Sequence, residues 1–297
     1  MVRRFTLTLT LSLKGEGKTC FNRYDVALRR CIVRVCVTLT LFIGLCAACS
    51  GPSPVAPTPP TEPPPSIEPP PPPTPRELSV TGLLAFGDSI TEGAISLAVP
   101  QFALTAGLEV SYPYKLQAML GERYSTQTIA VGNAGRSGER AEQGVARLPG
   151  VLTETQPELV LLLEGVNDLN LYGAAGLQRT LAKVGEMIAL CQMQGRQVMV
   201  GTLPPERPGG FRAGAIALIE PFNNGLKDVV RSQGASLVDV HAGFGGDLSL
   251  LGADGLHPTE AGYQRIAETF FEAIQQQFDT PRQIAILRDR GRPWPER

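Results

Sequence analysis

The stretch "ELVLLLEGVND", residues 158–168, decides the fold. Five consecutive apolar residues, Leu159 to Leu163, lead into a polar run that holds glycine, asparagine and aspartate. A strand that is apolar at every position is buried on both faces, as in a parallel sheet covered by helices. We therefore predict a buried strand here, whose carboxyl end opens into a polar loop.

Further apolar runs alternate with longer amphipathic stretches along residues 77–280. The other candidate strands are "LSVTGLLAFGD", "STQTIAVGN", "RQVMVGTLPP" and "ASLVDVHAG". Helical patterns are "YPYKLQAMLGERY", "ERAEQGVARLPGVLTET", "AAGLQRTLAKVGEMIALCQMQG", "AIALIEPFNNGLKDVVRSQG" and "TEAGYQRIAETFFEAIQQQF". Alternating strands and helices predict parallel βαβ units, hence one α/β domain over residues 77–280 with helices on both faces of its sheet.

Polar residues of the types used in catalysis recur where these apolar runs end. In an open parallel sheet, sites form outside the carboxyl ends of the strands. The residues at this predicted rim are Gly87, Asp88 and Ser89, then Gly132, Asn133, Gly135 and Gly138, then Gly165, Asn167 and Asp168, and later Asp254 and His257. Four polar clusters in this order favour a catalytic site over ordinary loop chemistry.

Ser89 is the candidate nucleophile, and a serine hydroxyl needs a base to take its proton. The chain has two histidines, His241 and His257. His257 follows Asp254 by three residues, so the carboxylate can orient one ring nitrogen and leave the other for the serine. His241 is the rival base. It follows Asp239 by two residues, which would place both side chains on one face of a strand.

Acyl transfer also needs hydrogen-bond donors for the oxyanion. The backbone N–H groups of Ser89 and Gly138 and the side-chain amide of Asn167 are the candidates. Gly138 permits close approach and unusual φ values. Gly135 is an alternative to Gly138 within the same glycine-rich loop.

The blocks "GDSIT", "NAGRSG", "GVND" and "DGLHP" resemble, in order, the four motif blocks of the SGNH (GDSL) hydrolases. The resemblance covers residues 77–280. It implies a three-layer α/β/α sandwich with a flavodoxin-like parallel sheet of about five strands. It also implies hydrolysis of an ester or thioester through an acyl-enzyme, with no metal and no organic cofactor.

The same resemblance implies a role for each matching residue. Ser89 would attack, His257 would carry the proton and Asp254 would orient His257. Ser89, Gly138 and Asn167 would form the oxyanion hole. Asp88 and Asp168 would brace the turns without taking part in the chemistry.

The substrate class stays open at this point. Members of the family cleave lipids, acyl thioesters and acetyl groups on carbohydrates, so a carbohydrate O-acetyl esterase is an alternative to a lipid acylhydrolase. Segment 94–112 would line an acyl pocket or pack as a surface loop, and residues 207–215 would form a flexible wall.

A non-catalytic binding lipoprotein on the same fold and a metal-dependent deacetylase are hypotheses of other classes. The intact Ser, His and Asp positions argue against the first, and the presence of only two histidines argues against the second.

Residues 1–49 are predicted to be an N-terminal extension followed by a segment that resembles a lipoprotein signal peptide. Residues 1–40 hold eight Lys and Arg, and the 14 residues Val35 to Ala48 carry no charge. That run is too short to cross a bilayer comfortably and fits the apolar core of an export signal. Small residues before Cys49 resemble a lipoprotein cleavage box, so we expect lipidation of Cys49 and a membrane anchor. Plain secretion and a retained anchor are the alternatives.

Residues 50–76 are a proline-rich linker, because 14 of the 26 prolines lie between Pro52 and Pro75. Such a segment cannot pack and forms an extended spacer. Residues 281–297 are predicted to be a basic, solvated tail.

The net charge of −1 and the pI near 6.2 give no indication of a nucleic-acid partner. Five of six cysteines lie at or before Cys49, and the remaining one, Cys191, is expected to be buried in a helix.

Overall fold

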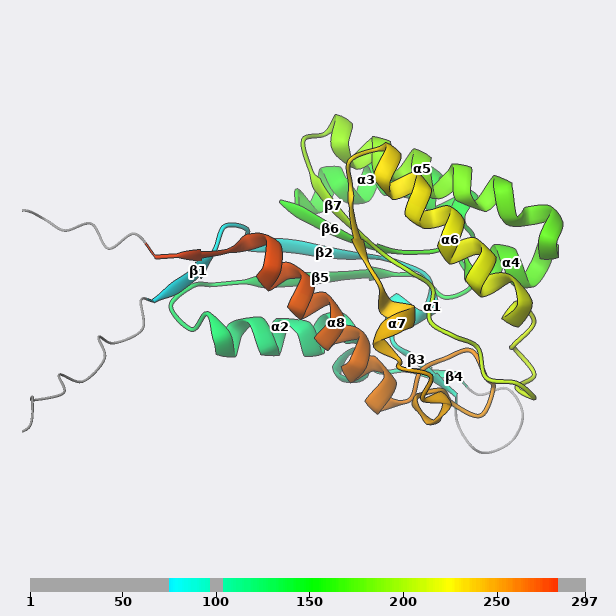
Figure 1. Ribbon diagram of the computed structural model, residues 1–297. Coiled ribbons are helices and arrows are strands. Elements are labelled where there is room, and N and C mark those ends of the chain that lie inside the picture. The colour runs from blue at the N-terminus through cyan, green and yellow to red at the C-terminus, as the bar shows by residue number, and fades with distance from the viewer. Residues whose placement is uncertain (1–74, 97–103, 283–297) are drawn as a thin grey trace, which may run out of the picture. The chain divides into compact units, whose positions relative to one another are not determined.

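A five-stranded parallel sheet forms the centre of the domain in the computed structural model, which describes residues 75–96 and 104–282 (Figure 1). The strand order is β5-β2-β6-β7-β8. The strands are β2 (Gly82–Gly87), β5 (Ala130–Gly135), β6 (Leu159–Leu163), β7 (Gln197–Gly201) and β8 (Ser236–Val238). All four pairings in this sheet are parallel, which confirms the predicted α/β fold.

β6 is the buried strand expected from its sequence. Each of its five residues is buried, and it pairs with β2 on one side and β7 on the other. Burying a leucine side chain contributes roughly 1.5–3 kcal/mol, so this short strand anchors the core. The register sets Gly87 opposite both Leu163 and Gly135, so β2, β5 and β6 end at the same level.

Helices cover both faces of the sheet, as the alternating pattern predicts (Figure 1). α2 (Tyr112–Arg123) and α8 (Glu260–Phe278) pack together on one face. The other face carries α3 (Ala141–Thr155), α5 (Leu177–Met193) and α6 (Ile216–Ser232). Cys191 is buried in α5, as expected.

Short helices connect the strand ends to the loops. They are α1 (Ser89–Glu92), α4 (Val166–Tyr172) and α7 (Val240–Gly243), with 3-10 turns η1 (Leu108–Val110), η2 (Gly173–Gly176) and η3 (Leu248–Leu250). Side chains cap the helices that flank the candidate site. Asp88 accepts the Ile90 N–H at the start of α1, and Thr259 accepts the Gly262 N–H at the start of α8.

The segment "LSVTGLLAFGD" contains the predicted strand, β2, but the strand is shorter than the segment, and Leu78 belongs to a separate strand. β1 (Arg76–Leu78) diverges and pairs antiparallel with β9 (Asp279–Pro281), while β2 begins at Gly82. The Arg76–Asp279 ion pair, at 2.9 Å, supports the β1–β9 ribbon. A separate hairpin joins β3 (Ala94–Ser96) to β4 (Leu104–Ala106). It accounts for part of the segment 94–112, whose role as a pocket wall stays a prediction.

The predicted leader, Cys49, most of the linker and residues 283–297 of the tail lie outside the described residues. The predictions made for them therefore stay predictions. Among the helices that the structure describes, none combines the length and apolarity needed to cross a membrane.

We predict that Leu161→Ala lowers the free energy of unfolding by about 2–5 kcal/mol, because it opens a cavity at a fully buried position of β6. Met193→Ala is the matched control, since the Met193 side chain at the end of α5 is 82% exposed. Urea denaturation followed by circular dichroism measures both variants. Equal midpoints for Leu161→Ala and the wild type would contradict the central position of β6.

Candidate active site

Ser89, His257 and Asp254 converge at the carboxyl end of the sheet. His257 Nε2 lies 2.9 Å from Ser89 Oγ, and His257 Nδ1 lies 2.6 Å from Asp254 Oδ2. Ser89 is the first residue of α1, directly after β2, whereas Asp254 and His257 come from the loop before α8. The three side chains are at most 3% exposed. The fold thus brings together the three residues that the sequence singled out as nucleophile, base and acid.

The carboxylate of Asp254 is held by more than the imidazole. Its Oδ1 accepts the backbone N–H groups of Leu256 and His257, at 3.1 and 3.0 Å. Burial raises the pKa of Asp254, but the hydrogen bonds and charge of His257 outweigh that effect and hold it below its usual value. Asp254 therefore stays ionised and keeps Nδ1 of His257 protonated, which leaves Nε2 as the acceptor for the serine proton.

Residues 207–215, predicted to be a flexible wall, brace the loop of Asp254. The Arg212 N–H donates to the Asp254 carbonyl at 2.9 Å, and the Arg207 N–H donates to the Gly255 carbonyl at 2.7 Å. The Arg212 guanidinium also lies 3.8 Å from Asp254 Oδ2. On the opposite side, Ser96 Oγ of β3 accepts the Asp254 N–H at 3.3 Å.

His241, the rival base, lies elsewhere, and the strand predicted to carry it ends earlier. β8 stops at Val238, and His241 belongs to α7. Asp239 does not orient the His241 ring as expected. Its carboxylate caps α7 by accepting the Ala242 N–H, accepts the Thr202 hydroxyl and pairs with Lys227. Because Asp239 serves as the N-cap of α7, β8 ends at Val238 after three residues.

The structure separates the two candidate glycines of the oxyanion hole. The N–H of Gly135 already donates to Asn133 Oδ1 at 2.9 Å, and a Cβ on Gly135 would overlap the backbone of Glu92. Gly138 lies in the exposed turn after β5 with a φ of 74° and open space around its Cα. Gly135 thus allows α1 to pack closely against β5. Gly138 remains the better candidate for a backbone N–H donor.

Asn167 stands between the nucleophile turn and the turn after β5. Its Nδ2 donates to the Glu139 carbonyl at 2.8 Å and lies 3.4 Å from Asp88 Oδ2. Ser89 is the first residue of α1, where a backbone N–H has no acceptor within the helix. The candidate donors of Ser89, Gly138 and Asn167 therefore come from three neighbouring strand ends.

Comparisons with known proteins show which family the chain belongs to. Residues 85–265 match the model of the GDSL-like Lipase/Acylhydrolase family. This chain belongs to that family. It is 28% identical to esterase TesA of Pseudomonas aeruginosa over 207 residues, which cover 67% of this chain and 98% of that protein. Family membership makes the chain a hydrolase that acts on ester bonds.

Solved structures share the fold. A lipase/acylhydrolase from Enterococcus faecalis superposes with a TM-score of 0.56 at 22% identity and covers 68% of this chain and 99% of its own. Est24, a carbohydrate acetylesterase from Sinorhizobium meliloti, gives 0.57 at 18% identity, with coverage of 67% and 100%. The sandwich of this GDSL hydrolase is thus that of its structural neighbours.

Sequence reasoning missed a group of buried carboxyl groups beside the site. Besides Asp88 and Asp168, which it expected to brace turns, the group includes Glu139 and Glu164. Asp168 does brace a turn, since its Oδ2 accepts the Ala141 N–H at 2.8 Å. Burial raises the pKa of Asp88 to about 7 and also raises that of Asp168. The only sequence signal for Glu164 was its place directly after a wholly apolar strand.

Arg147 of α3 neutralises one of these carboxyl groups. Its guanidinium pairs with Glu139, with Nε 2.7 Å from Oε1, and donates to the Ala134 carbonyl at 2.9 Å. It also stacks over the Phe86 ring, 4.0 Å from the ring centre. Because Glu139 in turn supplies the carbonyl that holds Asn167, this ion pair supports the position of a candidate oxyanion donor.

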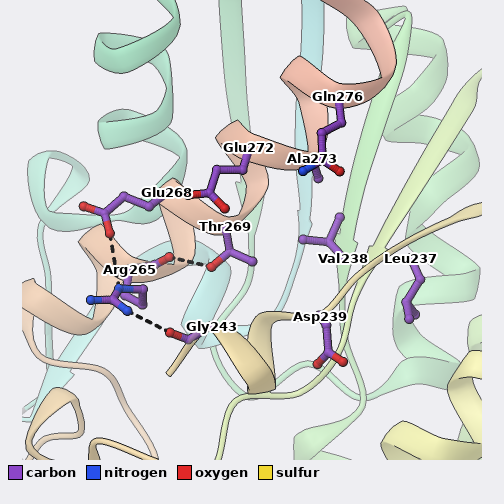
Figure 2. A pocket seen from close by; sticks show the side chains of 10 residues that line it. All are labelled: Leu237, Val238, Asp239, Gly243, Arg265, Glu268, Thr269, Glu272, Ala273 and Gln276. Atoms are coloured by element: carbon purple, nitrogen blue, oxygen red, sulfur yellow. Dashed lines mark hydrogen bonds and ion pairs between the residues drawn. The ribbon is translucent and has the colours of Figure 1, made fainter. Parts of the chain in front are cut away.

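A groove of about 490 Å³ lies elsewhere, between the edge strand β8 and α8 (Figure 2). Its walls include Asp239 from the end of β8 and Arg265, Glu268 and Glu272 from α8. The Arg265 side chain is held there by Glu268 and by the Gly243 carbonyl. None of the ten lining residues is Ser89, Asp254 or His257, so this groove is separate from the site.

We predict that Arg147→Met lowers the free energy of unfolding by about 3–5 kcal/mol, since it leaves the buried Glu139 carboxylate without its cation. Arg179→Met is the control and should change stability by less than about 1 kcal/mol, because the Arg179–Glu142 pair is exposed at both ends. Chemical denaturation measures both. Equal effects of the two substitutions would show that the Glu139 pair is not a buried one.

Proposed function

We propose that this GDSL hydrolase cleaves carboxylic esters through an acyl-enzyme, with Ser89 as nucleophile, His257 as base and Asp254 as the residue that orients His257. The observation that carries the proposal is the continuous hydrogen-bonded line from Ser89 Oγ through the imidazole to Asp254 Oδ2. Such a line activates a serine hydroxyl whatever the fold that carries it.

In the first half of the reaction, Ser89 Oγ attacks the ester carbonyl carbon while its proton moves to His257 Nε2. The imidazolium is stabilised by the ionised Asp254 carboxylate, whose position is held by two backbone N–H groups. The oxyanion accepts hydrogen bonds from the N–H groups of Ser89 and Gly138 and from the Asn167 amide. Collapse breaks the bond to the alcohol oxygen, which leaves with the proton from His257.

In the second half, water takes the place of the alcohol. His257 removes a proton from the water as its oxygen attacks the acyl carbon, and the same oxyanion donors hold the second tetrahedral intermediate. Collapse returns the proton to Ser89 Oγ and releases the carboxylic acid. In this scheme His257 Nε2 accepts and returns the proton in both halves of the reaction, so the proposed steps balance without a cofactor.

We further propose that the domain works as a lipoprotein of the bacterial cell envelope, exported and tethered by lipid on Cys49. The support is sequence alone: an uncharged run, small residues before Cys49 and a proline-rich spacer before the domain. Envelope lipids and acylated carbohydrates are then the esters within reach. The tether favours the outer membrane, because serine follows Cys49.

We predict that Ser89→Ala and His257→Ala each reduce kcat for p-nitrophenyl esters by a factor on the order of 10⁴ to 10⁶ while the protein stays folded. The control is His241→Ala, which keeps most of the activity because His241 makes no contact with the triad in the described part of the chain. An acyl series from acetyl to long chains, followed by the release of p-nitrophenolate, also shows the preferred chain length. A short-chain optimum indicates an acetyl esterase, and a long-chain optimum indicates a lipid acylhydrolase.

The base assignment fails if His241→Ala is inactive and His257→Ala is active. If no p-nitrophenyl ester is turned over and Ser89→Ala behaves like the wild type in every assay, the non-catalytic binding lipoprotein becomes the better hypothesis.

We predict that the full chain incorporates radioactive palmitate when it is expressed in a bacterium, and that Cys49→Ala does not. Cys36→Ala is the matched control, because it removes a thiol outside the predicted cleavage box and leaves Cys49 in place. Equal labelling of wild type and Cys49→Ala, or no labelling of either, would contradict lipidation at Cys49.

A further inference from the structure

Glu164 is a buried acid that the proposed reaction does not use. It lies between the end of β6 and α4, and the residue is 3% exposed. Both carboxyl oxygens are buried, and neither has a hydrogen-bond partner of normal geometry in the described part of the chain. An ionised carboxylate in such a place lacks both solvation and compensating contacts, so its charged form is strongly disfavoured.

The neighbouring charges add to this effect. Burial is the first cause that raises the pKa of Glu164 well above its usual value, and the carboxyl groups of Asp88, Glu139 and Asp168 raise it further. The backbone N–H of Gly165 gives only a smaller opposing effect. These groups come from three parts of the fold: the turn after β2, the turn after β5 and α4.

The cations near this group of acids already have other partners. Arg147 pairs with Glu139, and the charges of Arg140 and Arg179 act on Asp168. Glu164 has no ion pair with any residue that the structure describes. With four carboxyl groups and the half-buried Arg147 as their paired counter-charge, ionising all of the carboxyl groups would leave a large excess of negative charge beside the site.

Asp88 and Glu164 differ in what holds their oxygens. Asp88 Oδ1 accepts the Ile90 N–H at 2.9 Å, and Asp88 Oδ2 faces Asn167 Nδ2 at 3.4 Å. The charge of His257 also lowers the pKa of Asp88. Hydrogen bonds to the ionised form favour that form, and Glu164 has none of comparable geometry. The proton of this pair therefore belongs on Glu164.

The position of Glu164 ties it to the oxyanion donors. Asn167 is three residues further along the same turn, and Asp88 precedes Ser89 directly. The oxyanion intermediate places new negative charge on the donors of these two turns. A buried carboxylate next to them would repel that charge, because Coulomb interactions are strong where water is excluded.

We propose that Glu164 is a positioning residue that carries a proton during turnover, so that the two turns holding Ser89 and Asn167 surround a neutral carboxylic acid rather than an additional anion. The proposal builds on the proposed ester hydrolysis through Ser89. Its role is electrostatic: the protonated acid fills a polar position between the strand ends and adds no negative charge that would repel the oxyanion.

The first test compares the stability of wild type and Glu164→Gln from pH 5 to pH 9, and it needs no catalysis. In the unfolded chain a glutamate ionises near pH 4.3, whereas folded Glu164 keeps its proton, so the folded wild type loses stability as pH rises. Glutamine cannot ionise. We expect the ratio of the two unfolding constants to grow by up to tenfold per pH unit, with the wild type becoming relatively less stable.

Glu158→Gln is the matched control, because the Thr81 and Gly82 N–H groups lower the pKa of Glu158. The stability contribution of Glu158 is present above its unfolded pKa and is lost only in acid. Its stability difference from wild type should therefore stay constant over the same range. A constant difference for Glu164→Gln as well would overturn the proposal. If Glu164→Gln does not fold, Glu164→Met, also uncharged and unbranched, takes its place.

The second test uses His257 as a sensor, through the acid limb of kcat/KM for p-nitrophenyl acetate. A charged Glu164 would stabilise the imidazolium, so removing it would move the limb to lower pH. We expect the same midpoint in wild type and Glu164→Gln.

A fall of half a pH unit or more in Glu164→Gln would mean that Glu164 is ionised and would overturn the proposal. Absence of turnover in the wild type would instead count against the proposed esterase function, and the stability test would still decide the protonation of Glu164.

Discussion

The parallel pairing of β2 with β6 is the contact on which the site depends. In this register Gly87 lies opposite Leu163, and a Cβ on Gly87 would overlap the Leu163 carbonyl oxygen. Because the two strands end together, the turn that starts at Asp88 and the turn that contains Asn167 lie side by side. The proposed nucleophile Ser89 and the proposed oxyanion donor Asn167 thus become neighbours, although α2, β5 and α3 lie between them in the chain.

The same arrangement crowds acidic side chains into a space with little water. Glu139 is neutralised by Arg147, Asp88 and Asp168 accept backbone N–H groups, and Glu164 has only a proton to relieve it. The partners differ because the surrounding segments differ. Glu139 has a cation from α3, Asp88 and Asp168 have the free N–H groups at a helix start, and Glu164 has no hydrogen bond of normal geometry. Charge balance is therefore as much a property of this strand end as the alignment of its side chains.

The proposed base His257 and its partner Asp254 are held in a different way. Asp254 and His257 lie in a loop that α8 terminates at one end, where Thr259 caps the helix. Residues 207–215 hold this loop by backbone hydrogen bonds, and Ser96 contacts it from the β3–β4 hairpin. Segments from three parts of the chain thus fix a loop of a few residues, which suits the proposed role of His257, because a base must keep one ring orientation while it moves protons.

The sequence by itself determined the parts that depend on local chemistry. Apolar runs predicted the strands of the sheet, and the three-residue spacing of Asp254 and His257 predicted their hydrogen bond. Tertiary structure decided what depends on distant partners. Ser89, 168 residues before His257, became its neighbour, and β1 left the sheet to pair with β9. It also decided that Gly135 packs against α1, that Asp239 caps a helix and that Glu164 is buried without a partner. Burial and hydrogen-bond use are set by whichever segments pack around a residue, and no local pattern records them.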